Sequence, residues 1–157
     1  MSREASREAS GEVDGDPGGA AGIKGDPPVY THRILYGDTD QMGVVYYANY
    51  LVWMEVGRVE LCKSCGFNYR DMEKDDGILL AVAESHCQYR YPARYDDEIL
   101  VKTWIERATS RGVTFAYEMR LAEGDRRLAT GHTKHVFVSR AMRPAHLPEK
   151  YHALFGL

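Results

Sequence analysis

The chain has 157 residues, enough for one domain, and carries 20 basic and 23 acidic side chains, which gives a formal charge of −3. Because the first 28 residues hold three of the basic and six of the acidic side chains, residues 29–157 have no net charge. This balance argues against nucleic acid as a partner, since phosphate binding needs a clustered cationic surface.

Residues 1–28 differ in composition from the rest of the chain. They consist mainly of Gly, Pro, Ser, Ala and charged residues, with Val13 and Ile23 as the only large aliphatic side chains. Such a segment buries too little apolar surface to fold, so we expect a disordered tail at 1–28 and one domain at 29–157. A signal-peptide pattern and any run of about 18 apolar residues are both missing. The sequence therefore predicts a soluble, cytoplasmic protein that does not span a membrane.

The first predicted strand, 29–36, leads into the turn Tyr-Gly-Asp-Thr-Asp at 36–40, and a long apolar helix follows at 48–65. The first N–H groups of a helix have no intrahelical acceptor, and the helix dipole makes that end partially positive. A carboxylate beside it combines a base or nucleophile with oxyanion donors in one small pocket. The junction therefore suits attack on a carbonyl carbon, although Asp38 and Asp40 are also typical of turns and caps.

The predicted helix has eighteen residues and a length of about 27 Å. Its first half is apolar on almost every side, so other elements must cover most of its surface. Gly57 in its interior costs about 1 kcal/mol relative to alanine, which indicates that another backbone packs closely there. Glu55 and Arg58 are three residues apart on one face, a spacing that favours a partly buried ion pair.

Cys62 and Cys65 form a C-x-x-C pair at the end of this helix, and Cys87 makes the number of cysteines odd. A redox pair needs its first thiolate at the start of a helix, and a zinc site needs further ligands at suitable spacing. The pair meets neither condition. His132 and His135 lie on opposite faces of a predicted strand, so they do not form a metal site together. We therefore expect neither a metal nor a redox centre.

Four predicted strands follow the helix. The segment 113–121 alternates apolar and polar residues over nine positions, the pattern of a strand with one buried face. Weaker strand patterns cover 78–91, 98–106 and 127–138, with short turns between them. The order of elements predicts an α+β domain, in which a five-stranded antiparallel sheet is wrapped around one long central helix. A short amphipathic helix is predicted to begin at Pro148.

The junction before the helix resembles the signature of a known family. The pattern Tyr36-x-Asp38-Thr39-Asp40-x-x-Gly43-x-Val45-Tyr46-x-x-x-Tyr50, followed by Glu55-x-x-Arg58, is similar to that of the hotdog-fold acyl-CoA thioesterases of the 4-hydroxybenzoyl-CoA and Tol-Pal-associated type. The resemblance includes Pro92-Ala-Arg-Tyr-Asp-Asp, which follows the second strand. It implies hydrolysis of an acyl-CoA thioester, with CoA as part of the substrate and no separate cofactor. It also implies a homodimer with sites at the subunit interface, often doubled into a dimer of dimers.

The resemblance implies roles for particular residues. Asp40 falls on the catalytic aspartate, either as the base that activates water or as the nucleophile, and the backbone N–H of Tyr47 falls on the oxyanion donor. Gly43 would allow a tight turn and a close approach of the backbone to the ligand. Tyr36 would position the water or the acyl group, unless it only closes the strand against the core. The Tol-Pal-associated enzymes carry histidine at the position of Tyr47, whereas the 4-hydroxybenzoyl-CoA type has tyrosine. The resemblance therefore decides neither the mechanism nor the acyl group that the enzyme prefers.

Substrate contacts are predicted at two places. Tyr46 and Tyr50 lie at the start of the helix, where an aromatic lining suits a benzoyl ring as readily as an aliphatic chain. Arg111, Arg140 and Arg143 lie in two predicted loops where enzymes of this family bind the nucleotide and pyrophosphate of CoA. Guanidinium groups match the phosphates in charge and geometry.

Two other functions fit the same fold. A hotdog dehydratase uses a histidine with an acid at the central helix, and no histidine lies between His32 and His86. A non-catalytic module that binds acyl-CoA or a protein partner is the stronger alternative, because a fold does not guarantee turnover. Asp40 distinguishes this module from an enzyme, since a sensor does not need a carboxylate at the thioester carbonyl.

Overall fold

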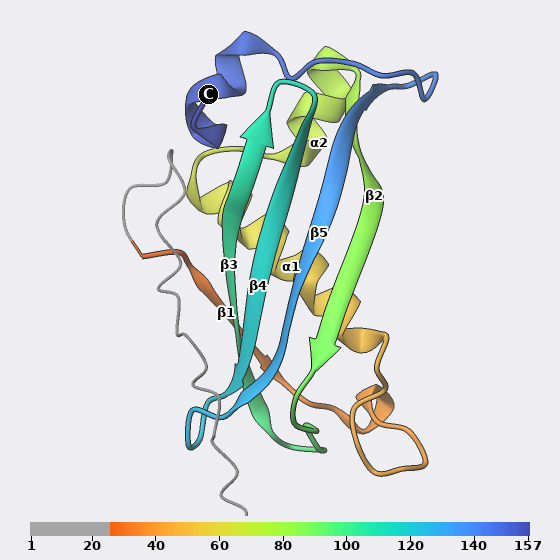
Figure 1. The fold of residues 1–157 in the computed structure, drawn as a ribbon, viewed down its shortest axis with the longest axis vertical. Coiled ribbons are helices and arrows are strands. Elements are labelled where there is room, and N and C mark those ends of the chain that lie inside the picture. Colours follow the sequence, from red (N-terminus) through yellow and green to blue (C-terminus); the bar gives the residue numbers. More distant parts are fainter. Residues whose placement is uncertain (1–25) are drawn as a thin grey trace, which may run out of the picture.

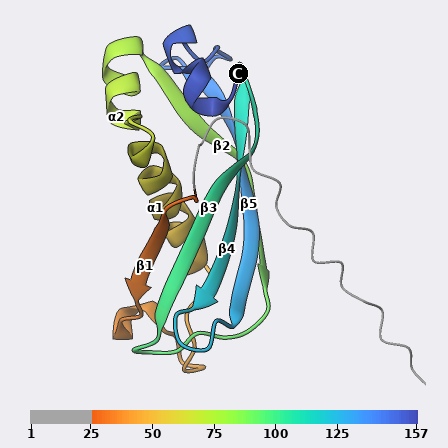
Figure 2. The same ribbon diagram turned by 90° about the vertical axis from the view of Figure 1, so that its left-hand side faces the viewer.

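The computed structural model describes residues 26–157, so the predicted tail at 1–28 lies almost wholly outside them. It shows an α+β fold with one five-stranded antiparallel sheet (Figures 1 and 2). The strands are β1 (Val29–Arg33), β2 (Ile78–Tyr89), β3 (Glu98–Thr109), β4 (Gly112–Leu121) and β5 (Arg127–Ser139). The helical segments are η1 (Tyr36–Asp38), α1 (Asn49–Ser64), α2 (Tyr69–Asp71), η2 (Met72–Asp76) and η3 (Glu149–Phe155).

The strands lie in the order β1-β3-β4-β5-β2, and each neighbouring pair is antiparallel. The five-stranded antiparallel sheet of the prediction is therefore confirmed. β2 forms one edge, where Ile78 pairs with Ser139 and Tyr89 pairs with Ala129. β2 ends beside the start of α1 (Figure 1). Because β5 runs antiparallel to β2, the end of β5 lies at the opposite end of the sheet.

β4 shows why the chain folds in this way. Its residues Val113, Phe115, Tyr117 and Met119 are all buried, as the alternation predicted, and they belong to the same core as the buried side chains of α1. Burial of this apolar face stabilises the fold by about 1.5 to 3 kcal/mol for each large side chain. Ala116 is buried as well, although it lies on the opposite face of the strand.

α1 has 16 residues rather than the predicted eighteen. Its buried residues recur at helical spacing and are Tyr50, Trp53, Met54, Gly57, Leu61 and Cys62. Leu51 and Val52, however, are 37% and 55% exposed, because the sheet covers the helix from one side only (Figure 2). Within this one chain, the prediction of a long helix wrapped by the sheet is therefore not confirmed.

Gly57 lies where α1 crosses β3. A Cβ atom at this position would clash with the hydroxyl of Thr103 and would lie 3.2 Å from Cγ1 of Val101. The close packing predicted from the sequence is present, but the neighbouring groups are side chains of β3 and not its backbone. A larger side chain at position 57 therefore has no room unless the helix moves away from the sheet.

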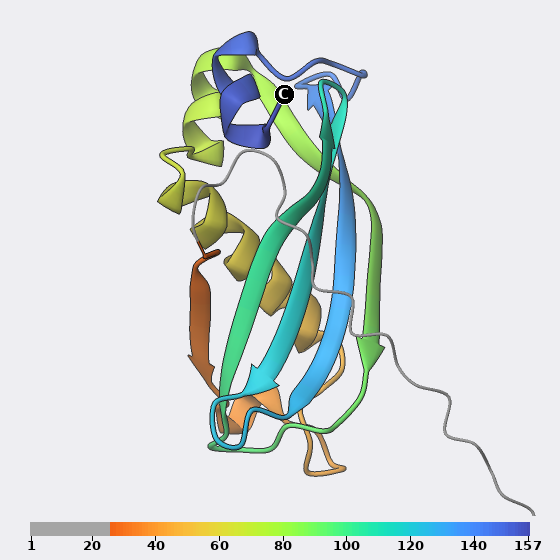
Figure 3. The same ribbon diagram turned by 60° about the vertical axis from the view of Figure 1, so that its left-hand side comes forward.

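Several boundaries differ from the prediction. β1 ends at Arg33, because residues 36–38 form the 3₁₀ turn η1, and β2 ends at Tyr89 and not at residue 91. The short segments α2 and η2 were not predicted, since they contain no complete helical repeat. η3 follows Pro148 as predicted (Figure 3). Its Phe155 is buried against Phe67, with 5.4 Å between ring centroids.

A buried histidine makes the fold sensitive to acid. His135 on β5 is 2% exposed, and its Nε2 lies 2.7 Å from Oγ1 of Thr133. Burial, followed by the charge of Arg58, lowers the pKa of His135 to about 4. An unfolded chain has a histidine pKa near about 6.5. Between these values only the unfolded state takes up the proton, so stability falls as the pH decreases through this window.

We expect this histidine to reduce the free energy of unfolding by about 3 kcal/mol between neutral pH and pH of about 4. Urea unfolding of the wild type and of His135→Gln near pH 7 and near pH 4.5 measures the effect, and the variant should lose less stability between the two. An equal loss in both proteins would mean that His135 does not contribute to acid unfolding.

Candidate active site

The turn before α1 is closed by backbone hydrogen bonds. The Asp40 N–H donates to the Val44 carbonyl at 3.0 Å, and the Gly43 N–H donates to the Asp40 carbonyl at 2.9 Å. Gly43 has φ of 72°, a left-handed conformation that a residue with a side chain adopts only with strain. The sequence prediction of a tight turn at Gly43 is therefore confirmed, and this turn fixes the direction of the Asp40 side chain.

Asp40 keeps one carboxylate oxygen available. Its Oδ1 accepts a hydrogen bond from the Met42 N–H at 2.8 Å, and the side chain is partly buried. Within residues 26–157, Oδ2 accepts no hydrogen bond and Asp40 forms no ion pair. Tyr46 at the start of the helix lies within the field of this carboxylate. Its pKa is raised, first by its neighbour Tyr47, then by burial and by the charge of Asp40.

Asp38, in contrast, is a structural residue of the same loop. Its Oδ2 lies 3.0 Å from Nε2 of His32 and accepts the Leu35 N–H at 2.9 Å. Its carbonyl oxygen accepts hydrogen bonds from the Tyr46 N–H at 2.9 Å and from Nδ2 of Asn49 at 2.8 Å. Asp38 thus ties η1 to β1 and to the first turn of α1, as its predicted role in a turn requires.

The N-terminus of α1 has a free donor. Ala48 precedes the first helical residue and provides no side-chain cap. The backbone N–H of Tyr47 donates no hydrogen bond within the part of the chain that the structure describes. An uncapped N-terminus combines such donors with the positive end of the helix dipole. This end of α1 therefore has the properties that an oxyanion needs.

Tyrosine side chains surround the helix start. The Tyr89 hydroxyl donates to the Tyr47 carbonyl at 3.0 Å, and the Tyr89 ring lies 5.1 Å from that of Tyr50. Burial raises the pKa of Tyr89, so its hydroxyl stays protonated and acts as a donor. No local sequence pattern marks Tyr89 as a site residue, because only the pairing of β2 in the sheet brings it to α1.

Two of the predicted site tyrosines occupy unexpected positions. Tyr50 is 3% exposed and packs against Trp53, so within this chain it supports the core and offers no surface to a ligand. Tyr36 is 76% exposed and lies 4.3 Å from the Tyr95 ring, so the alternative that it closes the strand against the core is wrong. Tyr46 is 45% exposed and remains available to a ligand.

The arginines predicted to bind CoA are far from Asp40 in the same chain. Arg111 lies in the β3–β4 turn, and Arg140 and Arg143 follow β5, at the end of the sheet opposite the loop before α1 (Figure 1). Arg140 already donates to the carbonyls of Glu73 at 2.8 Å and Lys74 at 3.2 Å. One chain alone therefore does not bring the predicted catalytic and phosphate-binding residues together.

The predicted ion pair between Glu55 and Arg58 is wrong. Neither residue forms an ion pair with any residue from 26 to 157, and Glu55 is exposed whereas the Nε of Arg58 is buried. Burial raises the pKa of the Tyr117 hydroxyl, and the hydrogen bond with Thr133 and the charge of Arg58 offset part of this increase. Both residues line a cavity of about 190 Å³ beside β2.

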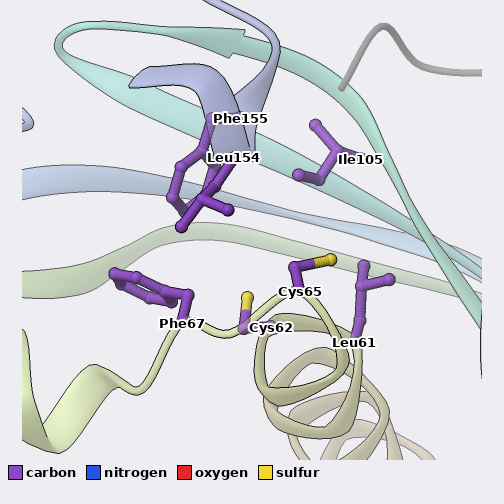
Figure 4. Close-up of a pocket in the computed structure, with 7 residues that line it drawn as sticks. All are labelled: Leu61, Cys62, Cys65, Phe67, Ile105, Leu154 and Phe155. Carbon is purple, nitrogen blue, oxygen red and sulfur yellow. The ribbon is translucent and has the colours of Figure 1, made fainter. Parts of the chain in front are cut away.

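The cysteines at the end of α1 lie in apolar surroundings that do not favour a reactive thiolate. Cys62 lies 3.1 Å from the Tyr69 hydroxyl, and burial raises the pKa of the Cys62 thiol to about 12, the opposite of a reactive thiolate. Together with Cys65 it borders a small apolar pocket beneath Leu154 and Phe155 (Figure 4). Among residues 26–157, no three His, Cys, Asp or Glu side chains are grouped so that they would hold a metal ion.

The family model of the thioesterase-like superfamily matches residues 34–155, which include the loop, α1 and the whole sheet except β1. The chain belongs to this superfamily. Comparisons with individual members agree with this assignment. The putative acyl-CoA thioesterase YneP of Bacillus subtilis is 45% identical over 93 residues, which are 59% of this chain and 67% of YneP. The acyl-CoA thioesterase YbgC of Haemophilus influenzae is 29% identical over 124 residues, 78% of this chain and 90% of YbgC.

Solved structures of the superfamily share the hotdog fold with this thioesterase-like domain. The DHNA-CoA thioesterase from Staphylococcus aureus is 30% identical, with a TM-score of 0.74, and the alignment covers 80% of this chain and 86% of that one. In the part of this superfamily member that the structure describes, none of the helices is both long and apolar enough to cross a membrane.

Proposed function

We propose that this chain hydrolyses acyl-CoA thioesters to the free acid and CoA. The main support is that, in a member of the thioesterase-like superfamily, the loop that leads into α1 holds a carboxylate with a free oxygen, and the start of the same helix has a free N–H. Asp40 either takes a proton from a water that attacks the thioester carbonyl, or attacks it directly to form an anhydride that water then hydrolyses. In both routes the C–S bond breaks and the CoA sulfur receives a proton.

In this mechanism the backbone N–H of Tyr47 binds the oxygen of the thioester carbonyl. Negative charge develops on that oxygen in the transition state, so the hydrogen bond strengthens as the reaction proceeds. Removal of one such donor typically costs about 3 to 4 kcal/mol. Because the donor belongs to the backbone, a substitution of the Tyr47 side chain leaves it in place. Tyr46 and Tyr36 are proposed to contact the acyl group, since both rings are exposed at this end of the molecule.

We further propose that the functional unit is a homodimer formed through β2. This edge strand has 12 residues and is exposed along much of its length, with Val82 58% exposed. An exposed edge strand is a template for pairing with a second strand. The exposed Leu51 and Val52 of α1 supply apolar surface for the same interface. A second copy would then cover the side of the helix that the sheet leaves open.

Antiparallel pairing of two β2 strands about a two-fold axis would also bring the predicted phosphate-binding arginines of one protomer toward the predicted catalytic residue of the other. It places the Ile78 end of one β2 against the Tyr89 end of the other. Ile78 pairs with Ser139, and Arg140 and Arg143 follow directly, whereas the Tyr89 hydroxyl donates to the carbonyl of Tyr47, just ahead of α1. The arginines of one protomer would therefore lie toward the Asp40 of its partner. The site needs both copies in this arrangement.

We expect Arg143→Ala to raise KM for acyl-CoA by about tenfold with little change in kcat, because the phosphates are bound equally in the ground and transition states. A mixture of Arg143→Ala chains with Asp40→Asn chains tests the dimer at the same time. A mixed dimer has one site with both native residues, so activity with the native KM should reappear on mixing. If the mixture is no more active than its components, Asp40 and Arg143 do not act across subunits.

The other expectations from the sequence remain predictions. They are the tail at 1–28 ahead of a domain at 29–157, a cytoplasmic location, the doubling of the dimer into a dimer of dimers, and a reaction that uses no separate cofactor. A size measurement in solution at several protein concentrations separates monomer, dimer and tetramer.

A further inference from the structure

The segment 92–97, with the sequence Pro-Ala-Arg-Tyr-Asp-Asp, connects β2 to β3 and has no role in the mechanism so far. It lies alongside the loop that carries Asp40, although about 50 residues separate the two. The Val45 N–H donates to the Ala93 carbonyl at 2.9 Å. Nη1 of Arg94 donates to the carbonyl of Gly43 at 3.2 Å. The turn that presents Asp40 is therefore attached to this segment at two successive points.

The segment also holds the beginning of the loop. The Ile34 N–H donates to the Asp97 carbonyl at 2.9 Å, and the Asp96 N–H donates to the Ile34 carbonyl at 3.0 Å. Further along, the ring of Tyr95 lies 4.3 Å from the ring of Tyr36. The path from β1 to α1 is thus attached to 92–97 both near its beginning and near its end, and among these contacts Arg94 is the side chain that bonds to the Asp40 turn.

The segment itself has a fixed shape. Oδ2 of Asp97 accepts the Arg94 N–H at 2.8 Å, and the Asp97 N–H donates to the Arg94 carbonyl at 3.2 Å. Asp96 has φ of 67°, a left-handed conformation that is uncommon for a residue other than glycine. Such conformations persist where the surrounding contacts determine them, and they occur often at functional sites. The Arg94 backbone is therefore held in place, and its side chain reaches the loop from a rigid base.

We propose that Arg94 is the positioning residue of the Asp40 turn. Its guanidinium holds the Gly43 carbonyl at the tip of the turn, while the Ala93 carbonyl holds the chain after the turn at Val45. If the Arg94 hydrogen bond is lost, the turn is held only by the bond between Val45 and Ala93 and can rotate about it. The Asp40 carboxylate would then move away from the position that it needs for the reaction. Displacement of a catalytic group by about 1 Å is enough to reduce the rate by about 10²-fold. The inference rests on the proposed thioesterase function of Asp40.

Steady-state kinetics of acyl-CoA hydrolysis with Arg94→Ala, Arg94→Lys and Arg126→Ala test the proposal. Arg126 is the matched control, because it lies over the Tyr91 ring at 4.3 Å and makes no contact with the Asp40 turn. We expect Arg94→Ala to lower kcat by about 10-fold to 100-fold with KM within about twofold of the wild type. Arg94→Lys should recover part of the loss, and added guanidinium ion at a non-denaturing concentration should recover part of it in Arg94→Ala.

Three results would overturn the proposal: a kcat of Arg94→Ala within about twofold of the wild type, an increase in KM alone, or a loss of kcat that neither lysine nor guanidinium ion relieves. Asp40→Asn in the same assay separates this inference from the function on which it rests. If Asp40→Asn is inactive and Arg94→Ala is fully active, only the positioning role fails. If Asp40→Asn remains as active as the wild type, hydrolysis does not depend on the Asp40 carboxylate, and the proposed role of Asp40 fails together with the positioning role of Arg94.

Discussion

Replacement of Asp40 by asparagine is expected to reduce kcat for acyl-CoA hydrolysis by about 10³-fold, within the range that a lost acid–base group typically costs. The change keeps the size of the side chain and retains an oxygen for the Met42 N–H, so the turn should stay intact. It removes the negative charge, so the side chain no longer takes a proton from water and no longer attacks the carbonyl. Thiol release from short, long and aromatic acyl-CoAs measures the effect and identifies the acyl class.

Asp38→Asn is the matched control for this experiment. Asp38 is the same residue type in the same loop, but its carboxylate is used by His32 and Leu35. We expect this variant to lower the melting temperature while it keeps most of the activity. Equal losses of activity in both variants would show that the loop conformation, and not the Asp40 carboxylate, limits turnover. A wild type that binds acyl-CoA but hydrolyses none of the panel would support the non-catalytic binding module instead.

Gly57→Leu is expected to lower the free energy of unfolding by about 3 kcal/mol, the upper part of the range for overpacking a core. Even a single methyl group at this position would clash with the Thr103 hydroxyl, and the branched leucine side chain would have to enter the space of Val101 as well. The better helix propensity of leucine returns less than about 1 kcal/mol of this loss. Urea unfolding of the wild type and the variant gives the difference.

A double substitution shows whether the clash is the cause. The Thr103 hydroxyl is buried and has no hydrogen-bond partner in the described chain, so Thr103→Ala removes the obstacle without leaving an unpaired group. We expect Gly57→Ala to be less destabilising in the Thr103→Ala background than in the wild type. Gly37→Ala is the control, because a Cβ there has no atom within 4 Å. If Gly57→Ala and Gly37→Ala have the same effect, α1 and β3 are not packed as tightly as the structure indicates.

Local patterns in the sequence were enough to predict several features of the fold. The alternation at 113–121 predicted a strand with one buried face, and Val113, Phe115, Tyr117 and Met119 are buried. The run of apolar residues after Ala48 predicted α1 to within two residues. Gly43 predicted a tight turn. These features follow from the side-chain period of 2 or 3.6 residues and from the freedom of glycine at positive φ, which one short segment reveals by itself.

Contacts between residues far apart in the chain depend on how the strands pair and could not be predicted from local patterns. Tyr89 and Arg94 lie 40 to 55 residues after the Asp40 turn, and no local pattern relates them to it, yet the sheet order brings both to the start of α1. The same packing turned Arg58 away from Glu55, buried Tyr50 and left Tyr36 exposed. It also placed Arg140 and Arg143 at the end of the sheet opposite Asp40. Strand pairing joins residues far apart in the chain, so the composition of the site is a property of the fold and not of its separate segments.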